Sequence, residues 1–225
     1  MGPTCTRNCR FCDIEPGRPK TLDPTEPQRV ASAARGLNLR HVVVTSVTRD
    51  DPPDGGARHF AATVAALRQE VPEASIEILT PDFRGVADAV GIVIEAAPDV
   101  FNHNVETVPR LYPTVRPGAD YRRSLDLLRA VGARSTIVTK SGLMVGVGET
   151  RDELIAVFKD LADAGVRVLT IGQYLAPSKD HLPVVRYWHP DEFSDLKREA
   201  EIAGIGTVVS APLVRSSYKA DLFRG

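Results

Sequence analysis

The chain of 225 residues has only three cysteines, few aromatic residues (6%) and a net charge of only −1. Few aromatic rings argue against a surface that stacks nucleic-acid bases. A charge near zero gives no electrostatic reason to bind nucleic acid or an anionic membrane. We find neither an apolar run of about eighteen residues, as a spanning helix needs, nor the pattern of a secretory signal. We therefore expect a cytoplasmic protein with no nucleic-acid or membrane partner.

The remaining composition is that of a globular protein, with 43% apolar and 25% charged residues. A chain of this length can bury a full hydrophobic core. We find no internal repeat, low-complexity tract or linker. The sequence predicts one domain over residues 1–225.

The three cysteines, Cys5, Cys9 and Cys12, all lie within the first twelve residues. Three thiolates on one short loop can hold three irons of a cubane cluster and leave the fourth iron open for a ligand. Structural zinc would need a fourth ligand, and the nearest histidine, His41, is far along the chain. A disulfide would leave one cysteine over. An iron–sulfur site is the preferred interpretation, with zinc or incidental cysteines as the alternatives.

Short β-branched runs alternate with stretches of helical periodicity. The predicted strands are His41–Ser46, Ser75–Thr80, Asp99–Val105, Ser135–Val145, Val166–Tyr174 and Gly206–Leu213. The predicted helices include Ala57–Val71, Asp120–Val131, Arg151–Ala164 and Asp191–Ala203. Capping boxes at Thr25–Gln28 and Thr150–Glu153 mark helix starts, and Gly36 and Gly165 mark helix ends.

This alternation predicts parallel strands joined by right-handed crossovers. The preferred fold class is α/β, a partial TIM-type (β/α) barrel; a flat doubly wound sheet is the alternative. In such barrels the site lies where the strands end. Polar side chains cluster there, and the candidates are Thr45, Ser46, Asn102, Asn104, Glu106, Lys140, Gly146, Glu149 and Gln173. We expect His103 to be structural.

The run CTRNCRFC, with Phe11 before the last cysteine, resembles the signature of radical S-adenosylmethionine (SAM) enzymes. Its wider context, CTRNCRFCDIEPGRP, resembles the lipoyl synthase branch of that superfamily. The resemblance extends through HVVVTSVTRDDPPDGG, FNHNVETVPRLYPTVRPGADY, TKSGLMVGVGET, TIGQYLAPSKDHLPVVRY and VRSSYKADLF. Several long blocks in order are more specific than the cysteine triplet alone.

The resemblance implies a [4Fe–4S] cluster held by Cys5, Cys9 and Cys12 that binds SAM. It implies that Phe11 and the strand-end candidates contact SAM, and that catalysis needs no residue beyond the cluster and SAM. Arg7 and Arg10 either offset the cluster's negative charge or are solvated. Asp50 and Asp51 would position substrate or SAM. Ser216 would be a ligand of a second, auxiliary [4Fe–4S] cluster.

The implied reaction inserts two sulfur atoms at C6 and C8 of an octanoyl-lysine on a lipoyl carrier protein. The carriers would be the E2 subunits of 2-oxoacid dehydrogenases or the glycine cleavage H protein, and the reductant flavodoxin or ferredoxin. The family's auxiliary-cluster cysteines lie in an N-terminal segment that this sequence lacks. We also expect the first barrel strand to be missing, and this chain alone to cleave SAM without inserting sulfur. A radical SAM enzyme acting on another substrate and a non-catalytic zinc-binding scaffold are the alternatives.

Overall fold

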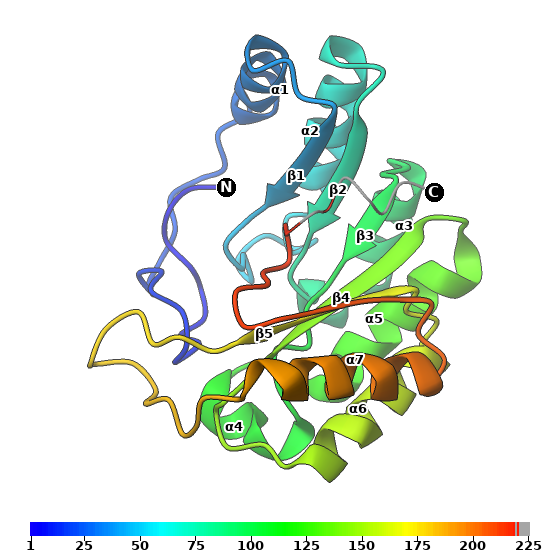
Figure 1. Cartoon of the computed structure of the whole chain (residues 1–225). Helices are drawn as coiled ribbons and strands as arrows, with labels where there is room; N and C mark the ends of the chain where they lie inside the picture. Colours follow the sequence, from blue (N-terminus) through cyan, green and yellow to red (C-terminus); the bar gives the residue numbers. More distant parts are fainter. Residues whose placement is uncertain (219, 221–225) are drawn as a thin grey trace.

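The computed structural model describes residues 1–218 and 220, and its main feature is a single parallel β-sheet (Figure 1). Its strands follow one another in chain order, from β1 to β6. They are β1 (His41–Thr45), β2 (Ser75–Leu79), β3 (Val100–Asn102), β4 (Val138–Val145), β5 (Val168–Gln173) and β6 (Thr207–Ser210). A doubly wound sheet would reverse its order at a switch point. The sequential order therefore supports the partial barrel.

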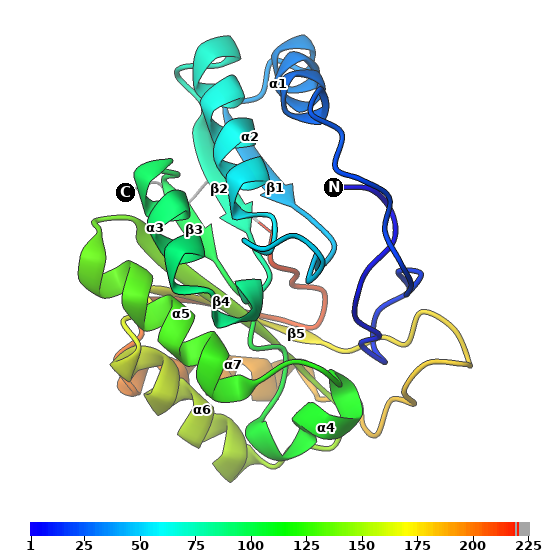
Figure 2. The same ribbon diagram turned by 180° about the vertical axis from the view of Figure 1, so that it is seen from behind.

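One helix precedes the first strand of the sheet, and the other helices connect successive strands. They are α1 (Glu26–Gly36), α2 (Ala57–Glu70), α3 (Ala87–Glu95), α4 (Tyr112–Val115), α5 (Tyr121–Arg134), α6 (Arg151–Asp163) and α7 (Pro190–Ile202), with 3₁₀ turns at Phe83–Gly85 and Pro109–Leu111. From behind, α2, α3, α5 and α6 cover one face of the sheet (Figure 2). The segment after β6 crosses the other face (Figure 1).

Alternation along the strands divides the core between the two faces. The main core joins strand residues such as Ile76, Phe101 and Leu169 to the apolar sides of the helices. A smaller cluster on the opposite face contains Val100, Val138 and Val168. Within the described residues no hydrogen-bonded ladder joins β1 to β6, so the barrel is open. No helix in this part of the chain is long and apolar enough to cross a membrane.

Several predicted element boundaries need correction. β3 is three residues long, not seven, because the chain leaves the regular ladder after Asn102. The capping box at Thr150 forms, but Thr25 makes no side-chain cap. Gly36 is the last residue of α1, as predicted, and Gly165 has the positive φ of 79° expected after a helix. Helix α3 was not predicted, because its sequence ADAVGIVIE is rich in β-branched residues and begins without a side-chain cap.

Candidate active site

The loop that carries the cysteines lies beside the segments that follow β1 and α4. The backbone N–H of Thr6 donates to the carbonyl oxygen of Thr48, and that of Arg10 donates to the carbonyl oxygen of Val115. The loop also contacts the long segment after β5, where the N–H of Leu182 donates to the carbonyl oxygen of Arg10. In both Figure 1 and Figure 2 the cysteine loop and the long segment after β5 lie side by side.

All three cysteines line one cavity of about 600 Å³. They are free thiols and half-buried. Burial raises the pKa of Cys9 to about 11 and also raises the pKa of Cys12. Across residues 1–218 and 220, no three His, Cys, Asp or Glu side chains are arranged to hold one metal ion. The three thiols thus line a common cavity without being arranged as a finished metal site.

The donor set in this cavity fits an iron–sulfur cluster. Three thiols are the soft ligands that iron–sulfur clusters use. Structural zinc would need a fourth ligand beside three thiols, and no such group of ligands is formed among the described residues. The guanidinium of Arg116 lines the same cavity and lowers the cost of negative charge at Cys9. The cavity thus offers soft donors, space and a buried cation together.

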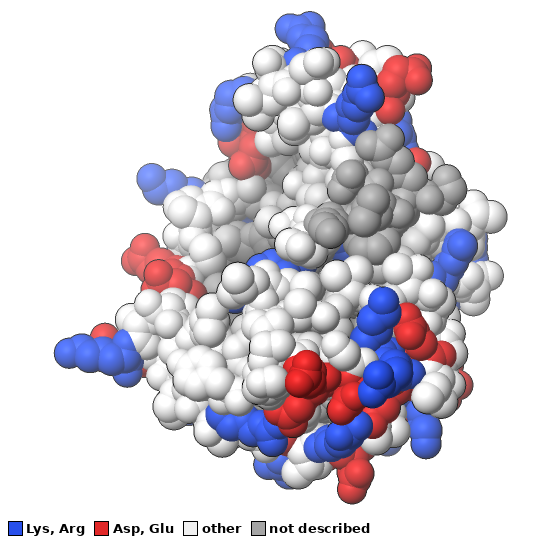
Figure 3. Space-filling view, in the orientation of Figure 1, with Lys and Arg blue, Asp and Glu red and all other residues white. Residues whose placement is uncertain are grey.

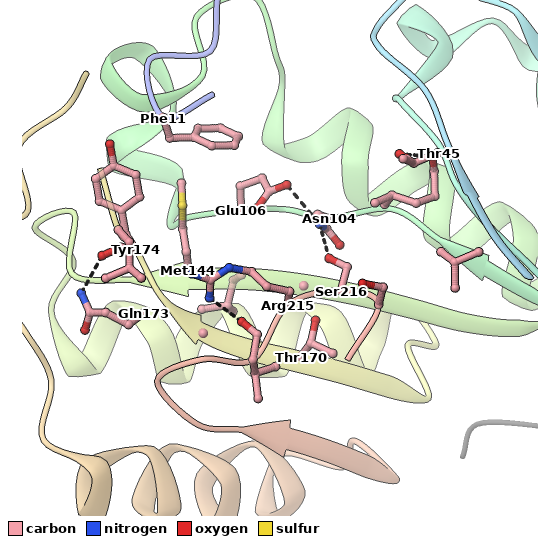
Figure 4. Close-up of a pocket in the computed structure, with 18 residues that line it drawn as sticks. Phe11, Thr45, Asn104, Glu106, Met144, Thr170, Gln173, Tyr174, Arg215 and Ser216 are labelled. Atoms are coloured by element: carbon pink, nitrogen blue, oxygen red, sulfur yellow. Dashed lines mark hydrogen bonds between the residues drawn. The ribbon is translucent and has the colours of Figure 1, made fainter. Parts of the chain in front are cut away.

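A second cavity, of about 500 Å³, adjoins the first (Figure 4). The two share Phe11, Thr45, Leu79, Asn104 and Glu106. Apolar side chains of β4 and of the segment that follows β5, including Met144 and Tyr174, form much of the second cavity's wall. The predicted residues Ser46 and Gln173 line the first and second cavity respectively.

Asn104 connects the two cavities through its side-chain amide. The Nδ2 group donates to Glu106 Oε1 at 3.1 Å and to Ser216 Oγ at 2.7 Å. Its Oδ1 atom is buried without a hydrogen-bond partner among the described residues. A buried acceptor left unpaired costs free energy. The site therefore holds an acceptor ready for a ligand's hydrogen-bond donor.

Glu106 has a backbone φ of 65°, which is uncommon for a residue other than glycine. Parallel pairing holds this conformation, because its N–H donates to Gly142 and its carbonyl accepts from Met144. Burial raises the pKa of its carboxyl, and Arg116 opposes that effect. Strained backbone that the surroundings enforce is frequent at ligand sites.

Gly142 leaves space between two polar side chains on the cavity wall. A Cβ atom there would lie 2.7 Å from both Asn104 Oδ1 and Thr170 Oγ1. Both distances are shorter than real Cβ atoms allow. Any larger residue would displace the amide that joins the two cavities.

Four of the predicted cofactor-binding residues line neither cavity. Asn102 and Lys140 are buried, and both contact the carboxylate of Glu77. This carboxylate accepts from Asn102 Nδ2 at 2.9 Å and from Lys140 Nζ at 2.9 and 3.0 Å. Glu149 accepts from the backbone N–H groups of Gly146 and Val147.

Glu149 also accepts from the indole of Trp188, while Gln173 binds the Trp188 backbone. These contacts fasten the segment that follows β5. The four residues outside the cavities, Asn102, Lys140, Gly146 and Glu149, therefore make contacts within the protein itself, and we do not include them among the SAM contacts.

The contacts also place the other charged candidates. Arg7 is buried, binds carboxylates and lines the same cavity as the three cysteines, so it is not solvated; Arg10 is exposed. Asp50 pairs with Arg7, and Asp51 pairs with Arg49. The two carboxylates thus shape the protein instead of facing a ligand.

His103, which we expected to be structural, lines the cysteine cavity and binds groups of the protein itself. Its Nδ1 donates to the carbonyl oxygen of Thr80, and its Nε2 lies 3.0 Å from Ser124 Oγ. Arg116, Met144 and Tyr174 are cavity residues that the sequence did not single out, because their placement depends on contacts between distant segments. The last block of family resemblance, VRSSYKADLF, lies partly outside the described residues, at 219 and 221–223.

Comparisons with known proteins identify the class to which this fold and site belong. The sequence profile of the Radical SAM superfamily matches residues 1–172. Methylornithine synthase (PylB) shares the fold with a TM-score of 0.66 and 16% identity, over 99% of this chain and 74% of that one. Streptococcus suis SuiB bound to S-adenosylmethionine gives a TM-score of 0.67 and 12% identity, over 92% and 48% of the two chains. The protein is a radical SAM protein.

Sequence relatives define the branch within that superfamily. The lipoyl synthase of Caldanaerobacter subterraneus subsp. tengcongensis is 56% identical, over 99% of this chain and 78% of its own length. That of Nitratidesulfovibrio vulgaris Hildenborough is 57% identical, over 98% and 74%. The chain belongs to the lipoyl synthase family.

Proposed function

We propose that this protein is a radical SAM sulfurtransferase that converts a protein-bound octanoyl-lysine to lipoyl-lysine by inserting sulfur at C6 and C8. The observation that carries the proposal is the common cavity of Cys5, Cys9 and Cys12 in a chain of the lipoyl synthase family. We further propose that residues 1–225 act as one radical SAM core domain.

The three thiols would hold a [4Fe–4S] cluster with one open iron for SAM. When bound, this cluster supplies the electron that cleaves SAM and starts hydrogen abstraction. Thr45, Ser46, Asn104 and Glu106 would orient SAM, because they present hydroxyl, amide and carboxylate groups to the same cavity. Phe11 would form part of the wall on both sides.

The second cavity suits the acyl substrate and the sulfur source. Leu143, Met144 and Tyr174 give it an apolar wall that would bury an octanoyl chain and exclude water. Ser216 faces the same space and would be a ligand of the auxiliary [4Fe–4S] cluster. The side-chain amide of Asn104 donates to the Ser216 hydroxyl at 2.7 Å and would thus join the SAM site to the auxiliary-cluster site.

The proposed reaction requires two partner proteins, an acyl carrier and an electron donor. The acyl chain would arrive on a lipoyl carrier domain, of the E2 subunit or H-protein type, and the electron would come from flavodoxin or ferredoxin. Free thiols and an oxygen-sensitive cluster suit the reducing cytoplasm.

Product analysis after anaerobic reconstitution with iron and sulfide tests the proposal. With SAM, reductant and an octanoyl-lysyl carrier peptide, we expect 5′-deoxyadenosine from this chain alone, and a thiolated or lipoylated peptide only when a sulfur-donating auxiliary cluster is also supplied. The variant Cys9→Ala should give neither product. Deoxyadenosine without thiolated peptide even when the auxiliary cluster is supplied would instead support a radical SAM enzyme for another substrate. Stoichiometric zinc without iron would overturn the proposal in favour of a scaffold.

A further inference from the structure

Arg7 lies between Cys5 and Cys9 but binds two carboxylates from other parts of the chain. Its Nε and Nη2 atoms donate to the two oxygens of Asp50, at 2.8 and 2.9 Å. Its Nη2 and Nη1 atoms donate to the two oxygens of Asp82, at 2.5 and 3.1 Å. One guanidinium thus joins the cysteine loop to the segments that follow β1 and β2.

The interior holds this arrangement firmly. The Arg7 side chain is 6% exposed and that of Asp82 is 1% exposed. Burial alone would raise the pKa of Asp82, but the hydrogen bonds from Arg7 hold it down to about 2. Asp82 also accepts from Arg123 and from the backbone N–H of Arg84. The carboxylates of Asp50 and Asp82 therefore lie against the guanidinium groups of Arg7 and Arg123, and two negative charges meet two positive charges.

The neighbouring residue adds a second connection at the same place. Thr6 donates through both its N–H and its Oγ to the carbonyl oxygen of Thr48, and its Oγ accepts from the N–H of Asp50. The Arg7 N–H itself lies 3.4 Å from Cys5 Sγ. Thr6 and Arg7 thus fix the backbone from which Cys5 and Cys9 project.

We propose that Arg7 is a positioning residue whose pairs with Asp50 and Asp82 hold the cysteine loop ready for its cluster. It acts through the loop backbone, and its guanidinium is engaged by Asp50 and Asp82. A planar guanidinium can bind two carboxylates bidentately, whereas the lysine ammonium is a single point charge. This inference rests on the proposed function for the identity of the bound group, but the clamp is a property of the metal-free protein.

The variant Arg7→Met removes the clamp, and Arg10→Met is its matched control, because Arg10 is exposed on the same loop. Arg7→Met/Asp82→Asn removes the buried carboxylate as well, so that an unpaired charge does not unfold the protein. Asp50→Asn breaks only the connection to the segment after β1. Thermal unfolding of each metal-free variant establishes that it folds.

The first readout is the alkylation rate of each cysteine in metal-free protein, measured by mass spectrometry. We expect faster alkylation of Cys5 and Cys9 in the Arg7 variants and a smaller increase in Asp50→Asn. The second readout is iron retention against a chelator after reconstitution. Residues that orient metal ligands typically contribute about 10- to 100-fold to affinity, and we expect a loss in this range. Arg7→Lys should recover only part of it.

Alkylation rates and iron retention equal to wild type in the Arg7 variants would overturn the clamp. If wild-type protein takes up no iron, the proposed function fails, while the alkylation rates still decide whether Arg7 holds the loop. If every Arg7 variant unfolds, the test depends on Asp50→Asn. Alkylation rates of Cys5 and Cys9 equal to wild type in that variant also overturn the proposal.

Discussion

At the scale of single residues, His103 shows how burial fixes a protonation state. Its side chain is buried, and burial lowers its pKa to about 4 from 6.5. The folded state therefore holds neutral histidine, and protonation between pH 6.5 and 4 favours the unfolded chain. This shift corresponds to about 3 kcal/mol of stability, present above pH 6.5 and lost as the pH falls through 4.

We expect His103→Gln to be less stable than wild type at pH 7 but to lose less stability on acidification to pH 4. Urea unfolding of both proteins at several pH values measures the difference. Parallel pH profiles would show that His103 is not the group that titrates.

Gly142→Ala tests the close approach at the cavity wall. The added methyl group would press on Asn104 and Thr170, and overpacking of this kind costs about 1–3 kcal/mol. We expect weaker SAM binding by calorimetry and a lower Tm. Gly36→Ala is the control, because no atom lies within 4 Å of its Cβ position and α1 includes it. Equal SAM affinity in Gly142→Ala and wild type would contradict this role.

The residues that could be predicted from sequence are those whose chemistry is local. The cysteine triplet is one loop, so its spacing alone indicates soft-metal ligation. The clamp of Arg7 on Asp82 joins positions 75 residues apart, and no local pattern reports it. Glu149 follows β4 and Lys140 lies within it, and both are polar residues that the sequence offered as ligand contacts. Their partners Trp188 and Glu77, however, come from other elements.

At the scale of elements, two similar sequence signals give different structures. Thr150 accepts from the N–H of Glu153 and forms a full capping box, whereas Thr25 bonds to Asp23 and Arg29. We expect Thr150→Ala to lower the free energy of unfolding by about 1 kcal/mol. Thr25→Ala should cost clearly less, because its contacts are exposed. Chemical denaturation compares them, and equal losses would contradict the capping assignment.

The positions of the strands were predicted better than the residues at which they begin and end. Runs of β-branched residues identify buried strands, but hydrogen bonding to the neighbouring strands decides where each strand stops. Irregular backbone at Glu106 follows β3 and continues beside β4 through a single bridge. Asn102, Asn104 and Glu106 occupy alternate positions of the sequence, but Asn102 contacts Glu77, whereas the other two line the cavities.

At the scale of the whole molecule, sequential parallel strands gather the polar strand ends at one edge. Figure 3 shows charges of both signs mixed over α7. Surface ion pairs of α6 and α7 include Arg151–Glu199 and Arg198–Asp195. These pairs agree with the near-zero net charge and form no single-sign surface there. The alternation of strands and helices predicted the architecture, whereas the packing of distant segments that builds the two cavities could not be read from it.

The central claim is that Cys5, Cys9 and Cys12 together hold one SAM-binding iron–sulfur cluster. Electron paramagnetic resonance of the reconstituted, reduced protein tests it most directly, with and without SAM. We predict the signal of one reduced [4Fe–4S] cluster that changes when SAM is added and disappears in Cys9→Ala. A protein that binds no iron, or a cluster signal that neither SAM nor Cys9→Ala alters, would contradict the account.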